Sequence, residues 1–208
     1  MNIEEKYVRG VYSEIADHFD NTRFCQWNFV KKFLEKQKED MRGIDIGCGN
    51  GKNMLINENL NIIGIDNCKE LVSICKKKNL NVFAGDCCDL KMENNYFDYA
   101  MSIAVFHHLG NEYRRHQALD QMIQVLKKGG CGIFSVWSIE NQEKRRKFVK
   151  GANFVNWERR RDRQIFKRYY YIFTKDMIYK FLQPFQTKIT IETIINERGN
   201  WVVVFYKK

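Results

Sequence analysis

Strand-like and helix-like patterns alternate along most of this 208-residue chain, and the alternation constrains its fold more than any other feature. Short apolar runs are expected to form strands at 42–46, 61–65, 80–84, 98–103 and 131–137. Apolar residues at helical spacing predict helices at 3–20, 25–38, 51–58, 68–78 and 112–127, the last ending at Gly129-Gly130. Such alternation predicts βαβ units, and therefore a parallel sheet with helices on both faces.

The end of the chain departs from this pattern. A helical stretch at 175–183 precedes two β-rich runs, 188–195 and 201–206, joined by the turn 197–200. Two such runs form a hairpin, so the last strand should run antiparallel to its neighbour. We therefore predict an α/β, Rossmann-like class I methyltransferase fold in one domain, 1–208. Its mostly parallel seven-stranded sheet ends in an antiparallel hairpin, which a plain dinucleotide-binding domain lacks.

A glycine-rich turn follows the first predicted strand and opens the next helix. Asp45, Gly47, Gly49 and Gly51 give it the pattern D-x-G-x-G-x-G. The NAD fingerprint G-x-G-x-x-G would need a small residue at position 52, where Lys52 stands. Glycines let the backbone turn sharply and approach a ligand closely. Because S-adenosylmethionine has no pyrophosphate, we expect the turn to hold the amino-acid part of this cofactor; a purely structural turn is the alternative.

Three further residues lie at the ends of predicted strands. Asp66 ends the second strand, where its carboxylate can accept hydrogen bonds from both ribose hydroxyls. Asp86 follows the third strand and is expected to accept from the adenine amino group, near the backbone N–H of Cys87. Ile103 ends the fourth strand and should line the same site. Carboxyl ends of parallel strands share one edge of a sheet, so these residues together predict an S-adenosylmethionine site.

The cysteines and histidines do not predict a metal site. No C-x-x-C pair occurs, and free cysteines in apolar stretches behave as small hydrophobes. The adjacent His107 and His108 would point in different directions on any regular element, so they form a poor metal pair. The cysteines, an odd number, are Cys25, Cys48, Cys68, Cys75, Cys87, Cys88 and Cys131.

The positive charge is concentrated in one segment. The chain has a formal net charge of +10, and residues 144–168 hold eleven Lys or Arg residues and two acids. The remainder holds 24 basic and 23 acidic residues. A concentrated excess indicates a polyanion partner, with a solvated basic surface as the alternative. No apolar run approaches the ~18 residues of a membrane span, and residues 1–10 are polar. We therefore expect a cytoplasmic protein with no membrane association, and a nuclear location as well is compatible with these features.

Several blocks of residues are specific to a smaller group of proteins than the glycine turn, which methyltransferases share in general. They are Val11-Tyr-Ser-Glu-Ile-Ala16, His18-Phe19, Thr22-Arg23, Ile103-Ala-Val-Phe-His-His-Leu109, Arg114-Arg115, Val136-Trp-Ser138, Phe154-Val-Asn-Trp157, Arg168-Tyr-Tyr170 and Asn200-Trp-Val-Val203. Spread over almost the whole chain, they resemble the eukaryotic tRNA wobble-uridine carboxymethyl methyltransferases. Members of that family methylate the carboxylate of 5-carboxymethyluridine to a methyl ester, and they work with a small zinc-binding activator subunit.

Carboxylate methylation makes few chemical demands. A free carboxylate has a pKa of about 4 and is already ionised at neutral pH, so attack on a methyl sulfonium needs no general base. The enzyme must align the reacting atoms and remove water from the nucleophile. Arginine forks hold carboxylates best. Arg23, after the first helix, and Arg168 are therefore the candidate carboxylate ligands, with surface salt bridges as the alternative.

Aromatic residues are the remaining candidates for the active site. Tyr12 is expected to cover the methionine end of the cofactor. His107 or His108 should line the uridine by a hydrogen bond, and Trp137 by stacking. Tyr12 and Trp137 could equally be core aromatics. We expect the N-terminal helices, 1–40, to lie over this active site.

The resemblance also implies two macromolecular partners. The basic insertion, 138–170, should bind the tRNA anticodon stem-loop, with Arg159, Arg160, Arg161 and Arg168 contacting RNA and Tyr169 among the stacking residues. The other stacking candidates there are Phe154, Trp157, Tyr170 and Tyr171. The third strand should lie at the sheet edge, where an open edge invites a partner. By resemblance, the activator docks near residues 80–92, around Leu80, Val82 and Phe83.

Two other functions are compatible with the same residues. The chain could methylate a small-molecule carboxylate, in which case the basic segment would be dispensable. It could also be a non-catalytic cofactor-binding subunit, although such a protein would be expected to lose Asp66 or the glycines. Which tRNAs are substrates, and which of the two histidines acts, does not follow from the sequence.

Overall fold

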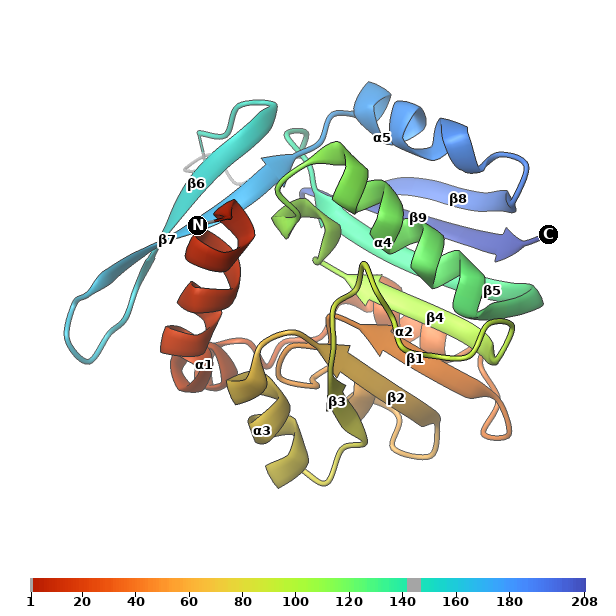
Figure 1. The fold of residues 1–208 in the computed structure, drawn as a ribbon, viewed down its shortest axis with the longest axis horizontal. Coiled ribbons are helices and arrows are strands. Elements are labelled where there is room, and N and C mark those ends of the chain that lie inside the picture. The colour runs from red at the N-terminus through yellow and green to blue at the C-terminus, as the bar shows by residue number, and fades with distance from the viewer. Residues whose placement is uncertain (1, 142–146) are drawn as a thin grey trace.

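A computed structural model describes residues 2–141 and 147–208, and within these ranges it confirms the predicted α/β architecture. A seven-stranded sheet has the order β3-β2-β1-β4-β5-β9-β8 (Figure 1). The first five strands in this order pair in parallel, whereas β9 is antiparallel to both β5 and β8. The strands are β1 Arg42–Ile46, β2 Asn61–Asp66, β3 Val82–Ala84, β4 Phe97–Ile103, β5 Leu126–Trp137, β8 Ile189–Glu197 and β9 Asn200–Lys207.

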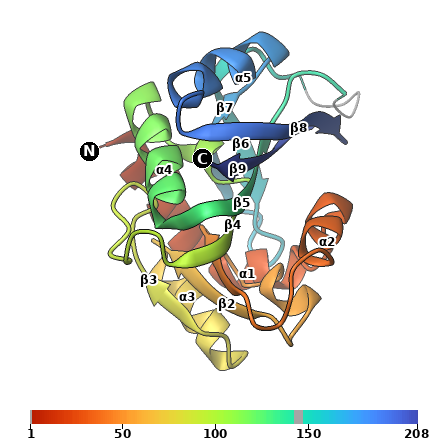
Figure 2. The same ribbon diagram turned by 90° about the vertical axis from the view of Figure 1, so that its right-hand side faces the viewer.

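Helices cover both faces of the sheet, as the alternation predicted. Figure 2 shows α4 and α2 on opposite sides of it. One core cluster joins the sheet to α4 and α5, and a second joins it to α2 and α3. The central strand β4 is buried on both faces, because parallel strands between two helical layers have no solvent face. The helices are α1 Gly10–Thr22, preceded by a π-helical turn at Glu5–Arg9, α2 Asn28–Leu34, α3 Lys69–Lys77, α4 Glu112–Val125 and α5 Lys175–Leu182.

Two local predictions were wrong. The helix expected at 51–58 is only a short 3-10 turn, Met54–Ile56, and Gly51 before it has a left-handed φ of 76° that a helix does not allow. Gly129-Gly130 does not end α4 either. Leu126 already pairs with Phe97 of β4, so β5 begins there and both glycines lie within it, with a bulge between the paired strands.

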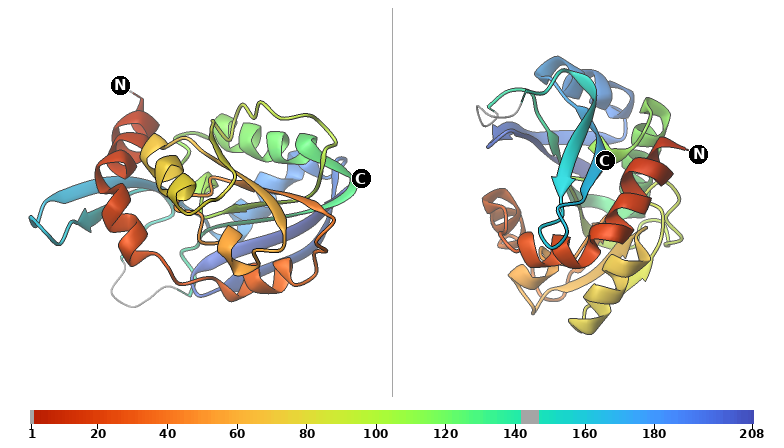
Figure 3. Two further views of the ribbon diagram at one scale, coloured as in Figure 1. Left: turned by 90° about the horizontal axis from the view of Figure 1, so that it is seen from below. Right: turned by 90° about the vertical axis from the view of Figure 1, so that its left-hand side faces the viewer.

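The basic insertion forms a separate antiparallel ribbon that the sequence did not predict. β6 Gly151–Glu158 pairs with β7 Ile165–Ile172, in a register that sets Val155 opposite Arg168. The ribbon extends from the end of the sheet where the parallel strands terminate, beside α1 (Figure 3). Lys144, Arg145 and Arg146 of the basic segment lie outside the described residues. Among the helices that the structure describes, none has the length and apolar character needed to cross a membrane.

Candidate active site

A cavity of about 1160 Å³ lies at the carboxyl ends of the parallel strands, between the glycine turn, α1 and the β6–β7 ribbon. It collects residues predicted from distant parts of the sequence. Those lining it are Tyr12, Arg23, Gly47, Gly49, Asp66, Cys87, Ile103, His107, His108, Trp137, Phe154, Trp157, Arg160, Arg168 and Tyr170. The other predicted residues do not line it: Asp45, Gly51, Asp86, Arg159, Arg161 and Tyr169. Of the predicted N-terminal cover, α1 lines the cavity through Tyr12, whereas α2 packs against the sheet.

The glycine turn has the close backbone approach that its pattern predicts. Gly47 and Gly49 have φ values of 76° and 58°, which a side chain would strain. A Cβ on Gly47 would also come within 2.4 Å of Val105. Gly51 serves packing instead, because a Cβ there would meet Leu80 at 2.3 Å. The turn therefore offers bare backbone to the cavity at its first two glycines.

Asp45 lies buried beneath this turn at 0% exposure. Neither of its carboxylate oxygens has a hydrogen-bond partner among the described residues. Burial raises its pKa to about 7 and the nearby Asp66 carboxylate adds to the effect, while the Asn53 side chain and Lys52 lower it in part without a well-formed hydrogen bond. A buried acid without a partner at this position fits a cationic ligand, such as the ammonium group of the methionine part of S-adenosylmethionine.

Asp66 ties the turn to the second strand. Its carboxylate accepts hydrogen bonds from the backbone N–H groups of Gly49, at 2.8 Å, and Cys68, at 2.9 Å. Burial raises the pKa of Asp66. Each carboxylate oxygen can accept more than one bond, so two N–H donors leave capacity for ribose hydroxyls. The residues present fit the adenosyl half of the cofactor as well as its amino-acid half.

The carboxylate of Asp86 has protein partners that the sequence did not predict. Its carboxylate receives two hydrogen bonds from the Arg114 guanidinium, at 2.8 and 3.1 Å, and one from the Cys88 N–H. Although burial opposes it, Arg114 lowers the pKa of Asp86. Arg114 also binds Glu4 through its Nε. The adenine role of Asp86 stays a prediction, and it would have to be compatible with this ion pair.

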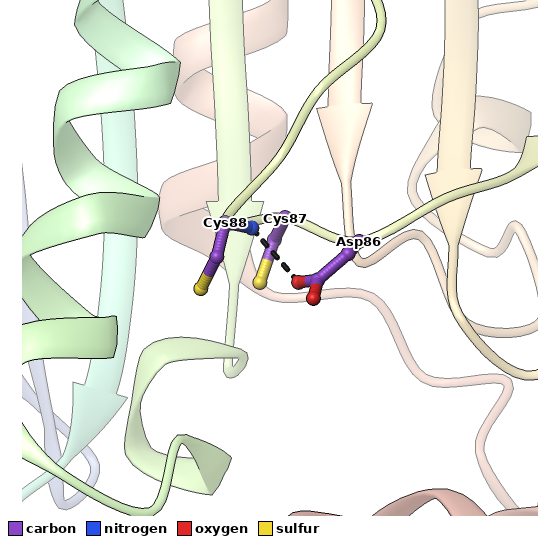
Figure 4. Close-up of side chains that lie close together, drawn as sticks. All are labelled: Asp86, Cys87 and Cys88. Atoms are coloured by element: carbon purple, nitrogen blue, oxygen red, sulfur yellow. Dashed lines mark hydrogen bonds between the residues drawn. The ribbon is translucent and has the colours of Figure 1, made fainter.

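Asp86, Cys87 and Cys88 lie close together, with their potential ligand atoms within 4.8 Å of one another (Figure 4). Their contacts favour packing over metal binding. The Cys88 thiol donates to the Arg114 carbonyl, and Arg114 also holds Asp86. The neighbouring Cys88 thiol and burial raise the pKa of Cys87 well above its usual value. A metal needs the thiolate form, which these surroundings disfavour.

Both histidines of the predicted pair are buried against the cavity and uncharged. The Nδ1 of His108 lies 2.8 Å from the Tyr169 carbonyl, so it carries the proton and donates. Its Nε2 then accepts from the Tyr12 hydroxyl at 3.2 Å. Burial lowers the pKa of His108 to about 3 and that of His107 well below its usual value. Neither can supply a positive charge to a carboxylate at neutral pH.

The two predicted arginines come together around one aromatic ring. The guanidinium carbons of Arg168 and Arg23 lie 4.6 and 4.7 Å from the centre of the Trp157 ring. Arg168 is only 5% exposed and donates to the hydroxyls of Tyr170, at 2.7 Å, and Tyr12, at 3.5 Å. It has no acidic partner in the part of the chain that the structure describes. A buried cation without a counter-ion, facing a cavity, is a candidate anion site.

Trp137 has aromatic neighbours on its ring. It stacks on Tyr170, with ring centres 4.1 Å apart and planes 14° from parallel, and on Phe148 at 5.5 Å. Stacking of uridine on Trp137 therefore stays a prediction, and it would require one of these contacts to open. Phe154, which is 51% exposed and lines the cavity, is the more accessible aromatic.

The predicted RNA-contacting residues of the ribbon divide into two kinds. Arg159 is buried, with hydrogen bonds to Asp162, Gln164 and the Glu14 carbonyl, so it joins the ribbon to α1. Tyr169 is 3% exposed and packs inward. Arg160 and Arg161 are exposed and available to a polyanion. Residues that sequence reasoning did not assign to the site include Asn53 and Asn200, both on the cavity wall. Asn200 begins the block 200–203 on which the family resemblance partly rests, whereas no sequence motif pointed to Asn53.

Comparisons with known proteins agree with this geometry. The methyltransferase domain family matches residues 44–134. A tRNA (carboxymethyluridine(34)-5-O)-methyltransferase of Schizosaccharomyces pombe is 34% identical over the whole chain and 99% of its own length. One of the same name from Arabidopsis thaliana is 40% identical over 68% of the chain, which spans only 35% of that longer protein.

Solved structures show the same fold. An S-adenosylmethionine-dependent methyltransferase from Clostridium acetobutylicum superposes with a TM-score of 0.69 at 15% identity, covering 95% of this chain and 99% of that one. The methyltransferase in a complex with the Haloferax volcanii Trm112 activator gives a TM-score of 0.65 at 14% identity, with 97% and 98% covered. By its full-length likeness to the fission yeast enzyme, the chain belongs to the tRNA (carboxymethyluridine(34)-5-O)-methyltransferase family.

Proposed function

We propose that the protein transfers a methyl group from S-adenosylmethionine to the carboxylate of 5-carboxymethyluridine at the wobble position of tRNA. The product is the methyl ester, 5-methoxycarbonylmethyluridine. Arg168 carries this proposal. It is a buried cation without an acidic partner in the described ranges, and it lines the same cavity as the glycine turn. An anionic acceptor group would supply the missing counter-charge.

The cofactor half of the cavity is lined by Gly47, Gly49 and Asp66, and Asp45 lies buried beneath the turn. The glycines allow close approach, Asp45 offers a negative charge for the ammonium group, and Asp66 offers acceptors for the ribose. When bound, the cofactor supplies an electrophilic methyl group on a sulfonium. The fit rests on the unpaired carboxylate oxygens of the buried Asp45 and on the remaining acceptor capacity of Asp66.

On the acceptor side, the protein positions the carboxylate and excludes water. Arg168 and Arg23 would hold the carboxylate oxygens, while Trp157 and Tyr170 keep the Arg168 guanidinium in place. The neutral His107 and His108 do not need to remove a proton, because the carboxylate is already ionised. α1 and the ribbon cover the cavity, which keeps water from the nucleophile.

Two surfaces suit the expected partners. The exposed Arg160 and Arg161 on the ribbon, with Phe154, would contact the anticodon stem-loop through phosphates and a stacked base.

The three-residue β3 forms one edge of the sheet, with Phe83 48% exposed. We infer that the zinc-binding activator docks there, near residues 80–92. A methyltransferase of the same fold forms a complex with an activator, which supports the existence of such a partner, and the exposed β3 edge is our reason for its position.

The direct test incubates the protein and its activator with labelled S-adenosylmethionine and tRNA that lacks only the terminal methyl ester. Mass analysis of the nucleosides should then show 5-methoxycarbonylmethyluridine. Label in a small acid, with none in tRNA, would favour the small-molecule alternative. Failure of the protein to bind the cofactor, with or without activator, would contradict both the tRNA methyltransferase and the small-molecule methyltransferase functions.

A matched pair of variants tests the anion site. Removing one partner of a buried charged contact costs about 2–5 kcal/mol, so Arg168→Met should lower kcat/KM for tRNA about 30-fold or more. Its affinity for the cofactor should stay near normal. Arg115→Met is the control, because Arg115 is also 5% exposed and stacks on Tyr171 at 3.8 Å but does not line the cavity. Equal losses in the two variants would contradict the assignment of Arg168.

A further inference from the structure

Several side chains that line the cavity have a buried polar atom without a partner, and His107 and Asn200 are two of them. His107 is 1% exposed and Asn200 is 2% exposed, and both line the cavity. His107 Nε2 and Asn200 Oδ1 have no hydrogen-bond partner among the described residues. Folded proteins rarely leave such atoms unpaired unless they have a role, because each costs about 1–3 kcal/mol. Neither atom is used by the carboxylate site or the cofactor site.

His107 is fixed as a donor at its free nitrogen. The backbone N–H of Trp137 donates to His107 Nδ1 at 2.9 Å. A neutral imidazole has one N–H, so the proton lies on Nε2. His108 differs, because both of its nitrogens already have partners. Of this adjacent pair, His107 is therefore the histidine that can still donate a hydrogen bond.

Asn200 is fixed as an acceptor. Its Nδ2 donates to the carbonyls of Glu197 and Arg198, both at 3.3 Å, within the β8–β9 turn. Rotating the amide by half a turn would place its oxygen against those two carbonyl oxygens. The amide orientation is therefore set by the turn, and Oδ1 remains the unsatisfied atom.

Both groups are held to the same residue at the end of β5. Asn200 is the cross-strand partner of Trp137 in the antiparallel pairing of β5 with β9. Directly opposed residues project from the same face of a sheet. His107 is joined to Trp137 through the hydrogen bond at its backbone N–H. One donor and one acceptor of fixed polarity are thus placed around Trp137, on the wall of the acceptor cavity.

We propose that His107 and Asn200 read the base that carries the carboxymethyl group. His107 Nε2–H donates to uracil O4, and Asn200 Oδ1 accepts from the adjacent uracil N3–H. This inference rests on the proposed function and adds base selectivity to it. Cytosine presents the opposite polarity on that edge, an amino donor beside an unprotonated N3. A 5-carboxymethylcytidine would leave both protein groups unpaired.

The experiment compares two anticodon stem-loop RNAs that differ only in the wobble base, 5-carboxymethyluridine or 5-carboxymethylcytidine. Each is incubated with the protein, its activator and labelled S-adenosylmethionine, and kcat/KM is measured for both. A site built to hydrogen-bond its substrate rejects a mismatched analogue strongly. We expect the wild type to prefer the uridine RNA by roughly 100-fold or more.

Two variants remove one hydrogen bond each. His107→Asn can keep an acceptor for the Trp137 N–H, at the place of Nδ1, while losing the Nε2 donor. Asn200→Ala loses the acceptor. Each should lower the uridine-to-cytidine ratio about 10-fold, chiefly through lost activity on uridine. The control is His116→Asn, because His116 also has an unpaired buried Nε2 but lies on α4, outside the cavity lining.

The ratio separates base reading from a structural role. A variant that merely loosens the fold lowers activity on both RNAs alike and leaves the ratio unchanged, which would overturn the inference. Equal methylation of the two RNAs by the wild type would overturn it as well, while the proposed function stood. Methylation of neither RNA, with the activator present, would overturn the proposed function and this inference together.

Discussion

Replacing Asp45 with Asn tests the cofactor half of the site through the stability of the protein alone. Asp45 is completely buried, and burial raises its pKa from 3.8 to about 7. In the unfolded chain the group ionises near its ordinary pKa, so between these two values the folded state binds the extra proton. Each unit of difference corresponds to about 1.36 kcal/mol, which gives roughly 4 kcal/mol in total.

The direction of the effect follows from the raised pKa. The stability that the protonated Asp45 contributes is fully present below about pH 4. It is lost as the pH rises toward 7, where the buried group must ionise. Relative to Asp45→Asn, which cannot ionise, the cofactor-free wild type should lose roughly 2–3 kcal/mol of unfolding free energy between pH 5 and pH 7. Urea unfolding of both proteins across this range measures the difference.

The ligand adds a second measurement. A cationic ammonium group near Asp45 favours its ionised form, so saturating S-adenosylmethionine should flatten the pH dependence of the wild type. Asp45→Asn should also bind the cofactor more weakly in calorimetry. A stability difference between wild type and variant that stays constant from pH 5 to pH 8 would refute the raised pKa. Unchanged cofactor affinity in the variant would refute the role of Asp45 toward the ammonium group.

Four other variants test the glycine turn, the ribbon and the sheet edge. Gly47→Ala introduces a Cβ at φ 76° and within 2.4 Å of a valine, so it should destabilise the protein by about 2–4 kcal/mol and abolish cofactor binding, measured by urea unfolding and calorimetry. Reversing Arg160 and Arg161 to Glu should raise KM for tRNA, with a weaker salt dependence, and leave the melting temperature unchanged. Arg159→Ala should instead lower the melting temperature, since its contacts hold the ribbon to α1; equal melting temperatures would contradict that structural role. Phe83→Asp at the β3 edge should weaken activator binding in a pull-down assay while the isolated protein stays folded, and undiminished binding would move the docking surface elsewhere.

Predictions succeeded where one local pattern governs the outcome. The parallel pairing of the first strands, the hairpin and the positive φ values of the glycine turn all follow from short-range periodicity and from residues that tolerate unusual backbone angles. They failed for two different reasons. The helix expected at 51–58 is only a 3-10 turn, which follows the left-handed Gly51. The start of β5 at Leu126 depends on pairing with Phe97 of a distant strand.

Charge placement shows the same limit. Arg159 and Arg160 are neighbours in one basic run, yet Arg159 is enclosed by Asp162 and Gln164 while Arg160 faces the cavity. Asp86 matched a cofactor pattern by its position after a strand, but Arg114, 28 residues further along, holds its carboxylate. Sequence spacing identifies charged residues without identifying their partners.

The sequence by itself determined the fold class, the cofactor turn and the acids at the strand ends, because strand termini in a parallel sheet must meet at one edge. It also determined the family, through blocks spread along the chain. Only the tertiary structure decided which residues share the acceptor site. Arg168 meets Tyr12 across 156 residues because the β6–β7 ribbon folds back over α1, and Asn200 meets Trp137 because β9 returns antiparallel to β5. Such contacts depend on how whole elements pack, which no local pattern in the chain records.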